Sequence, residues 1–307
     1  MATVSESSSK AYAQAQFTTN VSIGVNAALG IVKFAAGIMG NSLAMIADAM
    51  HTLSDVIASV AVWVGFKVAR QPADDAHPYG HGKAEQIAGK MVAIALFVVG
   101  IYIVWQGTAG IVGFARGMTE LEPPRAMVLY AAFLSIVVKE LNYQYQVRIG
   151  RRIGSVALVA DAWHHRSDSF SSVGVAIGIA AAMLGGPRWH WADEAAALVV
   201  ALLIIYMAWD IFKKAAAGLM DAQSSPVVRE KIKTVVCGVE GVKDVEKIFA
   251  RQSGLDLLID IHVAVDENMT VRESHRIATQ VKDRLIHDIP QVTHVLVHIE
   301  PYYAGDH

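Results

Sequence analysis

Six long apolar segments constrain this chain more than any other feature of its sequence. The hydrocarbon core of a bilayer is about 30 Å thick, so a helix that crosses it needs roughly 20 mainly apolar residues. The segments that meet this condition are 17–39, 43–68, 87–113, 126–147, 155–184 and 193–213. Hydrophobic residues make up 54% and charged residues only 18% of the 307 residues, an apolar share above that of ordinary soluble domains. We therefore predict a membrane protein with six transmembrane helices.

The distribution of basic residues predicts the orientation of these spans. An even number of spans places both chain ends on one side, and cytoplasmic loops carry an excess of Lys and Arg. On the faces shared with the termini the basic residues are Lys67, Arg70, Lys83, Arg148, Arg151, Arg152, Lys213 and Lys214. On the opposite faces they are Arg116, Arg125 and Arg188. We expect both termini in the cytoplasm and the spans in an inner or plasma membrane.

Changes in composition divide the chain into regions. Residues 1–15 are polar and lack the pattern of a secretory signal, so we expect a short, poorly ordered lead. Residues 16–214 form the predicted transmembrane region and 215–225 a linker that ends before Pro226. Residues 226–303 form a predicted cytoplasmic domain.

Local patterns in this last domain predict a small α+β fold of the metallochaperone-like kind. The predicted elements, in the order α-β-β-α-β, are a helix at 226–237, strands at 243–252 and 256–265, a helix at 270–288 and a strand at 292–299. The turn between the first two strands is expected at Ser253-Gly254.

Two classes of chemistry are set aside by the residues present. Cys237 is the one cysteine in the chain, so neither an internal disulfide nor a thiolate cluster can form, and any metal ligands must be His and carboxylates. The net charge is −2 and no basic run is interleaved with aromatic residues, which argues against a nucleic-acid partner.

An internal repeat carries the chemistry of the predicted spans. The segment ADAMHTLSDVIASVAVWVG from Ala47 matches ADAWHHRSDSFSSVGVAIG from Ala160. Each copy contains Asp-x-x-His-x-x-x-Asp, and positions i, i+3 and i+7 share one face of a helix. The residues that share a face are Asp48, His51 and Asp55 in the first copy and Asp161, His164 and Asp168 in the second.

Carboxylates inside a membrane are costly unless they are paired, hydrated or bound to a cation, so they indicate function. If the two faces meet, His51, Asp55, His164 and Asp168 supply two imidazoles and two carboxylates, a suitable four-coordinate set for Zn²⁺. The alternative is that these residues only join helices by hydrogen bonds. That alternative does not explain a duplicated His-x₃-Asp.

The first acid of each copy has two open interpretations. With a cytoplasmic N-terminus, Asp48 lies on the outer side of His51 and Asp161 on the inner side of His164. These acids are either relay positions, one for each side, or partners that hold the second ring nitrogen of each histidine. His165 follows His164 by 100° along the helix and is expected to point elsewhere and not to bind metal.

Together with the stretch QPADDAHPYGHGKAE from Gln71 to Glu85 and the C-terminal α/β domain, the paired motifs resemble the cation diffusion facilitator family. The resemblance covers the whole chain after the N-terminal lead. It implies that His51, Asp55, His164 and Asp168 form the transport site. It further implies a homodimer that alternates between inward-open and outward-open states and exchanges metal for protons.

The loop after the second span contains Asp74, His77 and His81, whose spacing allows one ion to be held. The resemblance implies a second metal site here, and the alternative is a polar loop with two incidental histidines. In the C-terminal domain, the resemblance implies metal ions between two copies. The candidate ligands are Glu246, His262, His275, His298 and Glu300. Glu246 replaces a histidine of the family pattern, which leaves the number of ions open, and exposed side chains on strand ends are the alternative.

The sequence gives less support for the roles of several other charged residues. Lys83 and Asp221 match family positions that form an interdomain salt bridge, although single surface ion pairs contribute little. Lys33 lies within a span, while Lys139 and Glu140 lie near a span end where long side chains are expected to reach the interface. No role is predicted for His287, His294 or His307.

These features predict a secondary transporter that moves a divalent transition metal out of the cytoplasm in exchange for protons. Imidazole and carboxylate ligands place Zn²⁺ first as substrate and possible regulatory ligand, with iron, cadmium, cobalt, nickel or manganese as alternatives. An intramembrane zinc hydrolase is disfavoured because the chain has no His-Glu-x-x-His. A metal-dependent membrane scaffold that moves no ions remains the other alternative.

Overall fold

A computed structural model describes residues 6–69, 71, 73–153, 155–254 and 256–303. Within its helices, the side chains that lie outside this description are those of residues 6–13, 15, 59, 62, 63, 66, 156, 157, 160 and 164. The chain divides into two compact units: Met1–Val60 with Val92–Asp210, and Ala61–Met91 with Ile211–His307. The second unit therefore includes the ends of three long helices as well as the C-terminal domain.

Six long helices carry the predicted spans. Their bounds are α1 Glu6–Met39, α2 Leu43–Ala69, α3 Ala84–Ala115, α4 Ala126–Ile153, α5 Val156–Leu184 and α6 Ala192–Leu219, with a short 3₁₀ helix at Pro187–Trp189. Among the described residues, five helices are long and apolar enough to cross a membrane: α1, α3, α4, α5 and α6. The remaining helix, α2, has 27 residues, about 40 Å at the usual rise per residue, and four of its side chains lie outside the described residues. The helical membrane class is confirmed, while α1 already begins at Glu6 within the lead that was expected to be poorly ordered.

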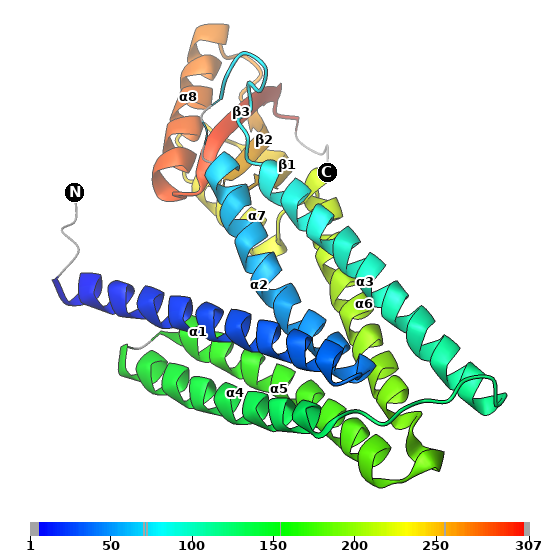
Figure 1. Ribbon diagram of the computed structural model, residues 1–307. Helices are drawn as coiled ribbons and strands as arrows, with labels where there is room; N and C mark the ends of the chain where they lie inside the picture. The colour runs from blue at the N-terminus through cyan, green and yellow to red at the C-terminus, as the bar shows by residue number, and fades with distance from the viewer. Residues whose placement is uncertain (1–5, 70, 72, 154, 255, 304–307) are drawn as a thin grey trace. The chain divides into compact units, whose positions relative to one another are not determined.

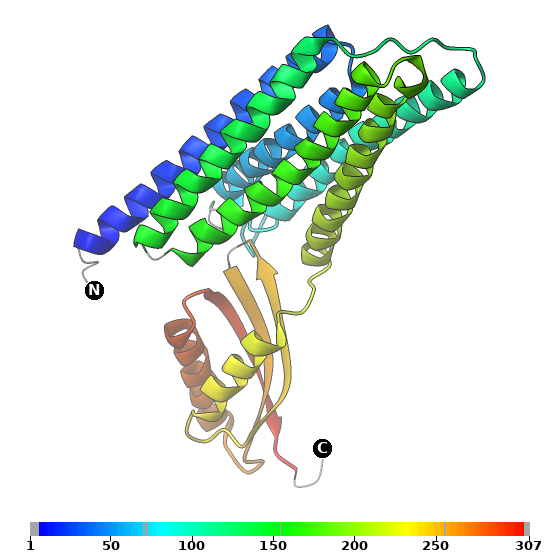
Figure 2. The ribbon, with the colours of Figure 1, turned by 90° about the horizontal axis from the view of Figure 1, so that it is seen from below.

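The helices of the first unit are joined by small and polar side chains. In Figures 1 and 2, α1, α4 and α5 lie side by side. Ser22 of α1 accepts hydrogen bonds from the side chains of Asn142, at 3.0 Å, and Gln146 on α4. Between α3 and α6 the contact is so close that a Cβ at Gly100 would lie 2.6 Å from the Ile205 side chain. Small residues at helix contacts and polar links between helices are typical of membrane bundles.

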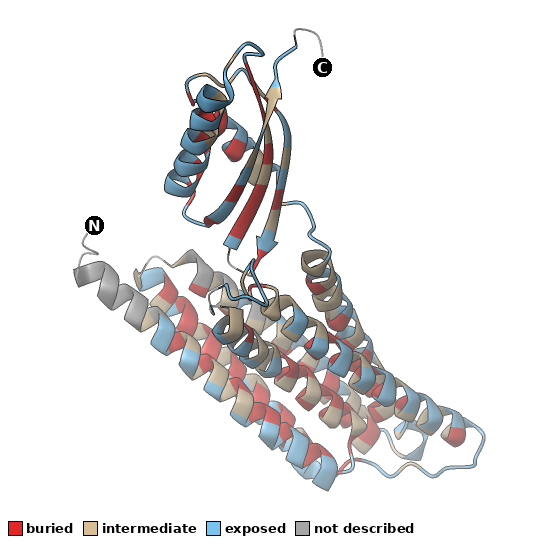
Figure 3. Cartoon of the chain, turned by 90° about the horizontal axis from the view of Figure 1, so that it is seen from above, coloured by how far each residue is buried: buried red, intermediate tan, exposed pale blue. Residues whose placement is uncertain are grey.

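The pattern of buried and exposed side chains in this unit is the one expected of a helical bundle surrounded by lipid. Buried positions in Figure 3 face neighbouring helices, and exposed positions face outward. Among the outward side chains are Ile31, Trp105, Phe133 and Leu202, all more than half exposed. Large apolar side chains on the outside of a helical bundle are compatible with contact to lipid acyl chains.

The N-terminal end of α2 is capped by a residue far away in the sequence. Asp193, in the first turn of α6, is 3% exposed. Its carboxylate accepts hydrogen bonds from the hydroxyl of Ser42 and from the backbone amides of Leu43 and Ala44. Since the first amides of a helix have no intrahelical acceptor, Asp193 fixes the start of α2 relative to α6.

The C-terminal part of the second unit has the predicted order of elements. They are α7 Pro226–Cys237, β1 Asp244–Ser253, β2 Asp256–Val265, α8 Val271–Asp288 and β3 Val292–Pro301. Strand β2 pairs antiparallel with β1 and parallel with β3, so that α8 is the crossover between the parallel strands (Figure 2). Cys237 ends α7 and is exposed.

The sheet has one face covered by helices and one open face. Ile232 of α7 and Ile277 and Val281 of α8 pack in one core with Ile259 and Ile261 of β2. Side chains alternate across a strand, so the intervening residues of β2 lie on the open face. A β-bulge between Val245 and Lys247 puts Glu246 at an irregular position on β1, and bulges redirect side chains.

Candidate metal sites

The structure brings predicted ligands from α2 and α5 together. His51, 3% exposed, and Asp168 line one cavity of about 530 Å³, whose other walls come from α5 and α6. Asp55 interacts electrostatically with both His51 and Asp168. The side chain of His164 lies outside the described residues. One imidazole and one carboxylate therefore line this cavity, and a second carboxylate, that of Asp55, interacts electrostatically with both.

The expectation that His165 points away from this site is wrong. Its Nδ1 lies 3.9 Å from Oδ2 of Asp168, and its Nε2 lies 3.7 Å from Oδ2 of Asp161. Residues three and four apart on a helix are surface neighbours, so a step of 100° from His164 does not remove His165 from the acids. Asp161 is 42% exposed on its side chain and its described contact is with His165.

Asp48 is held in a buried ion pair. Its Oδ2 lies 2.7 Å from Nζ of Lys33 on α1, and both side chains are fully buried. Ser172 of α5 donates a hydrogen bond to Oδ1 of Asp48 at 2.9 Å. The second ring nitrogen of His51, Nδ1, has no hydrogen-bond partner among the described residues, so Asp48 does not hold it.

Lys139 also departs from its expected position, because it is 5% exposed on α4 and does not extend to the surface. It interacts electrostatically with Asp48 and Asp55. Its neighbour Glu140 accepts from Arg166 of α5, with Nε 3.3 Å from Oε2. A lysine within an apolar segment indicates a buried, paired charge, and this pattern was available in the sequence for Lys33 and Lys139. The identity of their partners depends on which helices pack together.

The loop triad forms a compact cluster. His77 Nδ1 lies 3.2 Å from Oδ1 of Asp74, His81 Nε2 lies 3.5 Å from Oδ2, and the two imidazole centroids are 4.4 Å apart. Their ligand atoms are close enough together to hold one metal ion. The backbone N–H of His77, which donates to Asp74, and then the His77 side chain hold the pKa of this carboxyl below its usual range. An ionised carboxylate beside two imidazoles is a suitable ligand set for Zn²⁺ and similar ions.

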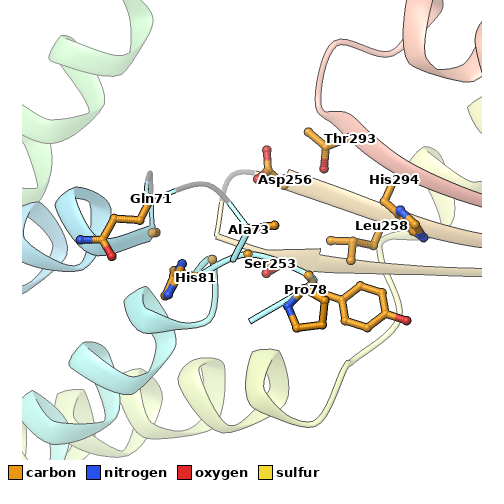
Figure 4. A pocket seen from close by; sticks show the side chains of 13 residues that line it. Gln71, Ala73, Pro78, His81, Ser253, Asp256, Leu258, Thr293 and His294 are labelled. Atoms are coloured by element: carbon orange, nitrogen blue, oxygen red, sulfur yellow. The ribbon is translucent and has the colours of Figure 1, made fainter. Parts of the chain in front are cut away.

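The loop borders a cavity of about 490 Å³ within the second unit. Figure 4 shows His81 on the loop side of this cavity and Asp256, Thr293 and His294 on the strand side. Tyr79 meets His294 edge to face, with centroids 5.8 Å apart. His294, which had no predicted role, therefore contacts the loop and not a metal cluster.

A second compact cluster lies on the open face of the sheet. His262 and His298 are register partners on β2 and β3, and Glu300 follows on the same face. Oε1 of Glu300 lies 2.5 Å from Nδ1 of His262 and 3.5 Å from Nε2 of His298. A hydrogen bond with Glu246 and then one with His262 lower the pKa of Glu300. Four of the five predicted ligands therefore gather here.

His275 does not join this cluster within one chain. It is exposed on α8, the helix that packs on the covered face of the sheet, whereas His262, His298 and Glu300 lie on the open face. The sequence spacing gave no information on this separation, because it depends on which face of the sheet the helix covers.

The predicted salt bridge is present within the second unit. Nζ of Lys83 lies 3.0 Å from Oδ1 of Asp221, and the side chains are 41% and 45% exposed. Arg251 also approaches Asp221, at 3.5 Å, and pairs with Asp260 at 3.0 Å. The contact between Lys83 and Asp221 is thus part of a small charge network that includes Arg251 of β1 and Asp260 of β2.

Comparisons with known proteins agree with this architecture. The profile of the cation efflux transmembrane domain matches residues 20–220, and that of the cytoplasmic domain of cation efflux proteins matches residues 225–302. The manganese efflux system protein MneP of Bacillus subtilis (strain 168) is 33% identical over 271 residues, covering 87% of this chain and 89% of that protein. The magnetosome protein MamB of Magnetospira sp. (strain QH-2) is 33% identical over 269 residues, covering 88% and 89%. A solved C-terminal domain of MamM is 28% identical and covers 25% of this chain and 96% of its own length, with a TM-score of 0.25.

Proposed function

Since the chain belongs to the cation diffusion facilitator family of metal cation efflux transporters, we propose that it exports Zn²⁺ from the cytoplasm in exchange for protons. It is a secondary transporter and not an enzyme. The observation that carries the proposal is the shared cavity of His51 and Asp168, with Asp55 in electrostatic contact with both.

The proposed transport site consists of His51, Asp55, His164 and Asp168. Two carboxylates balance the charge of one divalent ion, which reduces the cost of holding it within a membrane. Two imidazoles complete a tetrahedral set of the kind that zinc adopts. His165 is a further candidate donor, because it lies beside Asp168.

Competition for these ligands provides the proposed exchange. A metal ion binds deprotonated imidazoles and carboxylates, so binding expels protons and protonation expels metal. Alternation between an inward-open and an outward-open state would carry the ion one way and the protons the other. Such a cycle requires that the two states differ in their affinity for metal.

Manganese is the main competing substrate in this proposal, since the relative MneP is named as a manganese efflux protein. Mn²⁺ prefers oxygen ligands, whereas imidazole suits zinc and other later transition metals. A site with two imidazoles therefore favours Zn²⁺. Iron, cadmium, cobalt and nickel remain candidates, as does a scaffold that moves no ions.

Two further sites would bind the same class of ion. We assign one ion to Asp74, His77 and His81, and at least one to the cluster of Glu246, His262, His298 and Glu300. His275 would have to come from a second copy of the chain, which supports a homodimer held together by metal. The ion would then act as a regulatory or assembly ligand, and Lys83 with Asp221 would couple the soluble domain to the spans.

In the proposed orientation both termini lie in the cytoplasm, and the protein resides in an inner or plasma membrane. The excess of Lys and Arg near the ends of the helices that face the termini supports this assignment.

Zinc flux into proteoliposomes with an imposed proton gradient tests the proposal. Asp55→Ala and Asp168→Ala should each abolish gradient-dependent flux, while Asp283→Ala, which removes an exposed acid from α8, should leave it unchanged. Parallel assays with Mn²⁺ and Fe²⁺ identify the substrate. Absence of flux for every metal in a folded native dimer would favour the scaffold.

A further inference from the structure

Three helices of the first unit meet at a fully buried lysine. Nζ of Lys33, on α1, lies 2.7 Å from Oδ2 of Asp48 on α2. The same ammonium donates hydrogen bonds of 3.1 Å to the hydroxyls of Thr52 on α2 and Ser172 on α5. Ser172 in turn donates to Oδ1 of Asp48 at 2.9 Å. The ammonium therefore has three described partners, and both carboxylate oxygens of Asp48 are engaged.

This arrangement determines what Asp48 can do in the membrane domain. Asp48 shares a helix face with His51 and Asp55, because it precedes them by three and seven residues. Without Lys33 it would be a third carboxylate on the face that lines the transport site. Removing one partner of a buried pair leaves an uncompensated charge, which is strongly unfavourable. An ion that entered the site would then be attracted to Asp48 as well as to Asp55 and Asp168.

We propose that Lys33 is a positioning residue that determines metal selectivity, by holding Asp48 away from the transported ion and by fixing α2 against α5. The inference rests on the proposed transport site at His51, Asp55, His164 and Asp168. With Asp48 neutralised, the site offers two carboxylates and its imidazoles, a set that suits zinc. Release of Asp48 adds an oxygen donor and a negative charge, which favours the harder Mn²⁺.

Metal binding to the full-length protein in detergent tests this role. The quantity to measure is the ratio of the Kd for Mn²⁺ to the Kd for Zn²⁺, in a background where Glu300→Gln and His77→Ala remove the other clusters. Lys33→Met should lower this ratio about fivefold or more, because Asp48 becomes available as an oxygen ligand. Lys33→Met with Asp48→Asn should restore it, since the third carboxylate is then absent. Lys67→Met, which removes a lysine from the exposed end of α2, should leave the ratio unchanged.

A merely structural role predicts a different pattern. Poorer packing would weaken binding of both metals by the same factor, so that Lys33→Met leaves the ratio unchanged, or it would shift the ratio in a way that the double variant does not reverse. Either result overturns the proposal, as does loss of zinc binding in a folded protein that carries both Lys33→Met and Asp48→Asn, which would make Asp48 a ligand. Asp55→Ala serves as the independent check on the transport site. If it leaves binding intact in this background, the proposed site has failed, and Lys33 has no site to position.

Ser172→Ala keeps the test decisive if Lys33→Met does not fold. It removes the hydroxyl that donates to Asp48 and accepts from Lys33, but it leaves both charged partners of the ion pair in place. A smaller shift of the ratio toward Mn²⁺, about twofold, is expected because one of the contacts that hold Asp48 is lost. An unchanged ratio in a folded Ser172→Ala protein contradicts the proposal.

Discussion

Asp193 and Ser42 are joined by a hydrogen bond of 2.6 Å in which the Ser42 hydroxyl donates to Oδ1, 151 residues away in the sequence. The other carboxylate oxygen accepts from the Leu43 amide at 2.7 Å. One side chain at the start of α6 thus caps the helix that carries His51 and Asp55. The position of the proposed transport site therefore depends on a residue outside the proposed ligand set.

Replacement of Asp193 by Ala should destabilise the membrane domain. The loss of a helix cap and of buried hydrogen bonds to a charged group is worth about 1–3 kcal/mol. Thermal unfolding in detergent should show a lower midpoint for Asp193→Ala than for the native chain, with a smaller loss for Asp193→Asn. Asp283→Ala is the matched control. Equal midpoints for Asp193→Ala and the control would mean that the cap contributes nothing.

Replacement of Glu300 by Gln should remove metal from the soluble domain. Glu300 lies within 3.5 Å of both histidines of its cluster, so one change removes the oxygen shared by the set. We expect the zinc affinity of this cluster to fall by about 10-fold or more, as for changes close to other metal sites. His287→Ala is the control, since this side chain is 88% exposed and lies outside the cluster. Calorimetric titration of zinc in an Asp55→Ala, His77→Ala background measures the difference.

His275→Ala should weaken metal binding only in the dimer. The open face of one chain lacks His275, so a second copy would supply it. In sedimentation experiments, zinc should tighten the native dimer and should tighten the His275→Ala dimer less. An equal zinc effect on both proteins would remove His275 from the site.

Protonation of Asp74 should not weaken zinc binding at the loop site near neutral pH. Hydrogen bonds with His77 lower the pKa of Asp74. A lowered carboxyl pKa means that the ionised form persists to lower pH, so its contribution is lost only as the pH falls below the usual range for Asp, about 3.9. Asp74 should therefore remain an ionised ligand between about pH 7 and pH 5.

Asp74→Asn tests whether the carboxylate contributes to the pH dependence of zinc binding at this loop. The change should weaken zinc binding by a similar factor at each pH, because it removes a charge that does not titrate in this range. Calorimetric titration in an Asp55→Ala, Glu300→Gln background measures the slope. A slope that becomes flat in Asp74→Asn would assign the protonation to the carboxylate.

The pair of Lys83 and Asp221 should matter little for stability. Exposed ion pairs contribute about 0–1 kcal/mol, so Lys83→Met should change the unfolding midpoint only slightly. If the pair couples the domain to the spans, zinc flux should fall in Lys83→Asp and recover when Asp221→Lys is added. If the double variant folds but does not recover flux, the attraction between these two charges does not couple the domain to the spans.

Much of the fold follows from local patterns in the sequence. Apolar length predicts the spans, and alternation with turn residues predicts α7 to β3 almost to the residue. The repeat likewise predicts that His51 and Asp55 share one face of their helix and that Asp168 lies on the matching face of another, because helical spacing fixes these faces. The loop triad is predictable for the same reason, since Asp74, His77 and His81 are close in sequence.

The remaining features depend on contacts between distant segments. Lys33 and Asp48 pair because the packing of α1 against α2 brings these two positions together. Asp193 caps α2 because the first turn of α6 lies beside the first turn of α2. The place of Glu246 depends on a bulge, where two residues of one strand face one residue of the next. His165 lies beside Asp161 and Asp168 because residues three and four apart on a helix are neighbours, so a step of 100° from His164 leaves its imidazole near these acids.

The exposed thiol of Cys237 makes this protein unusually easy to follow by spectroscopy. Because the sequence contains one cysteine and it ends α7 on the surface, a nitroxide or fluorophore can be attached without first removing other thiols. A homodimer would carry two labels, related by its symmetry axis. The distance between them, recorded while zinc and protons are varied, would report how far the soluble domains separate during the cycle.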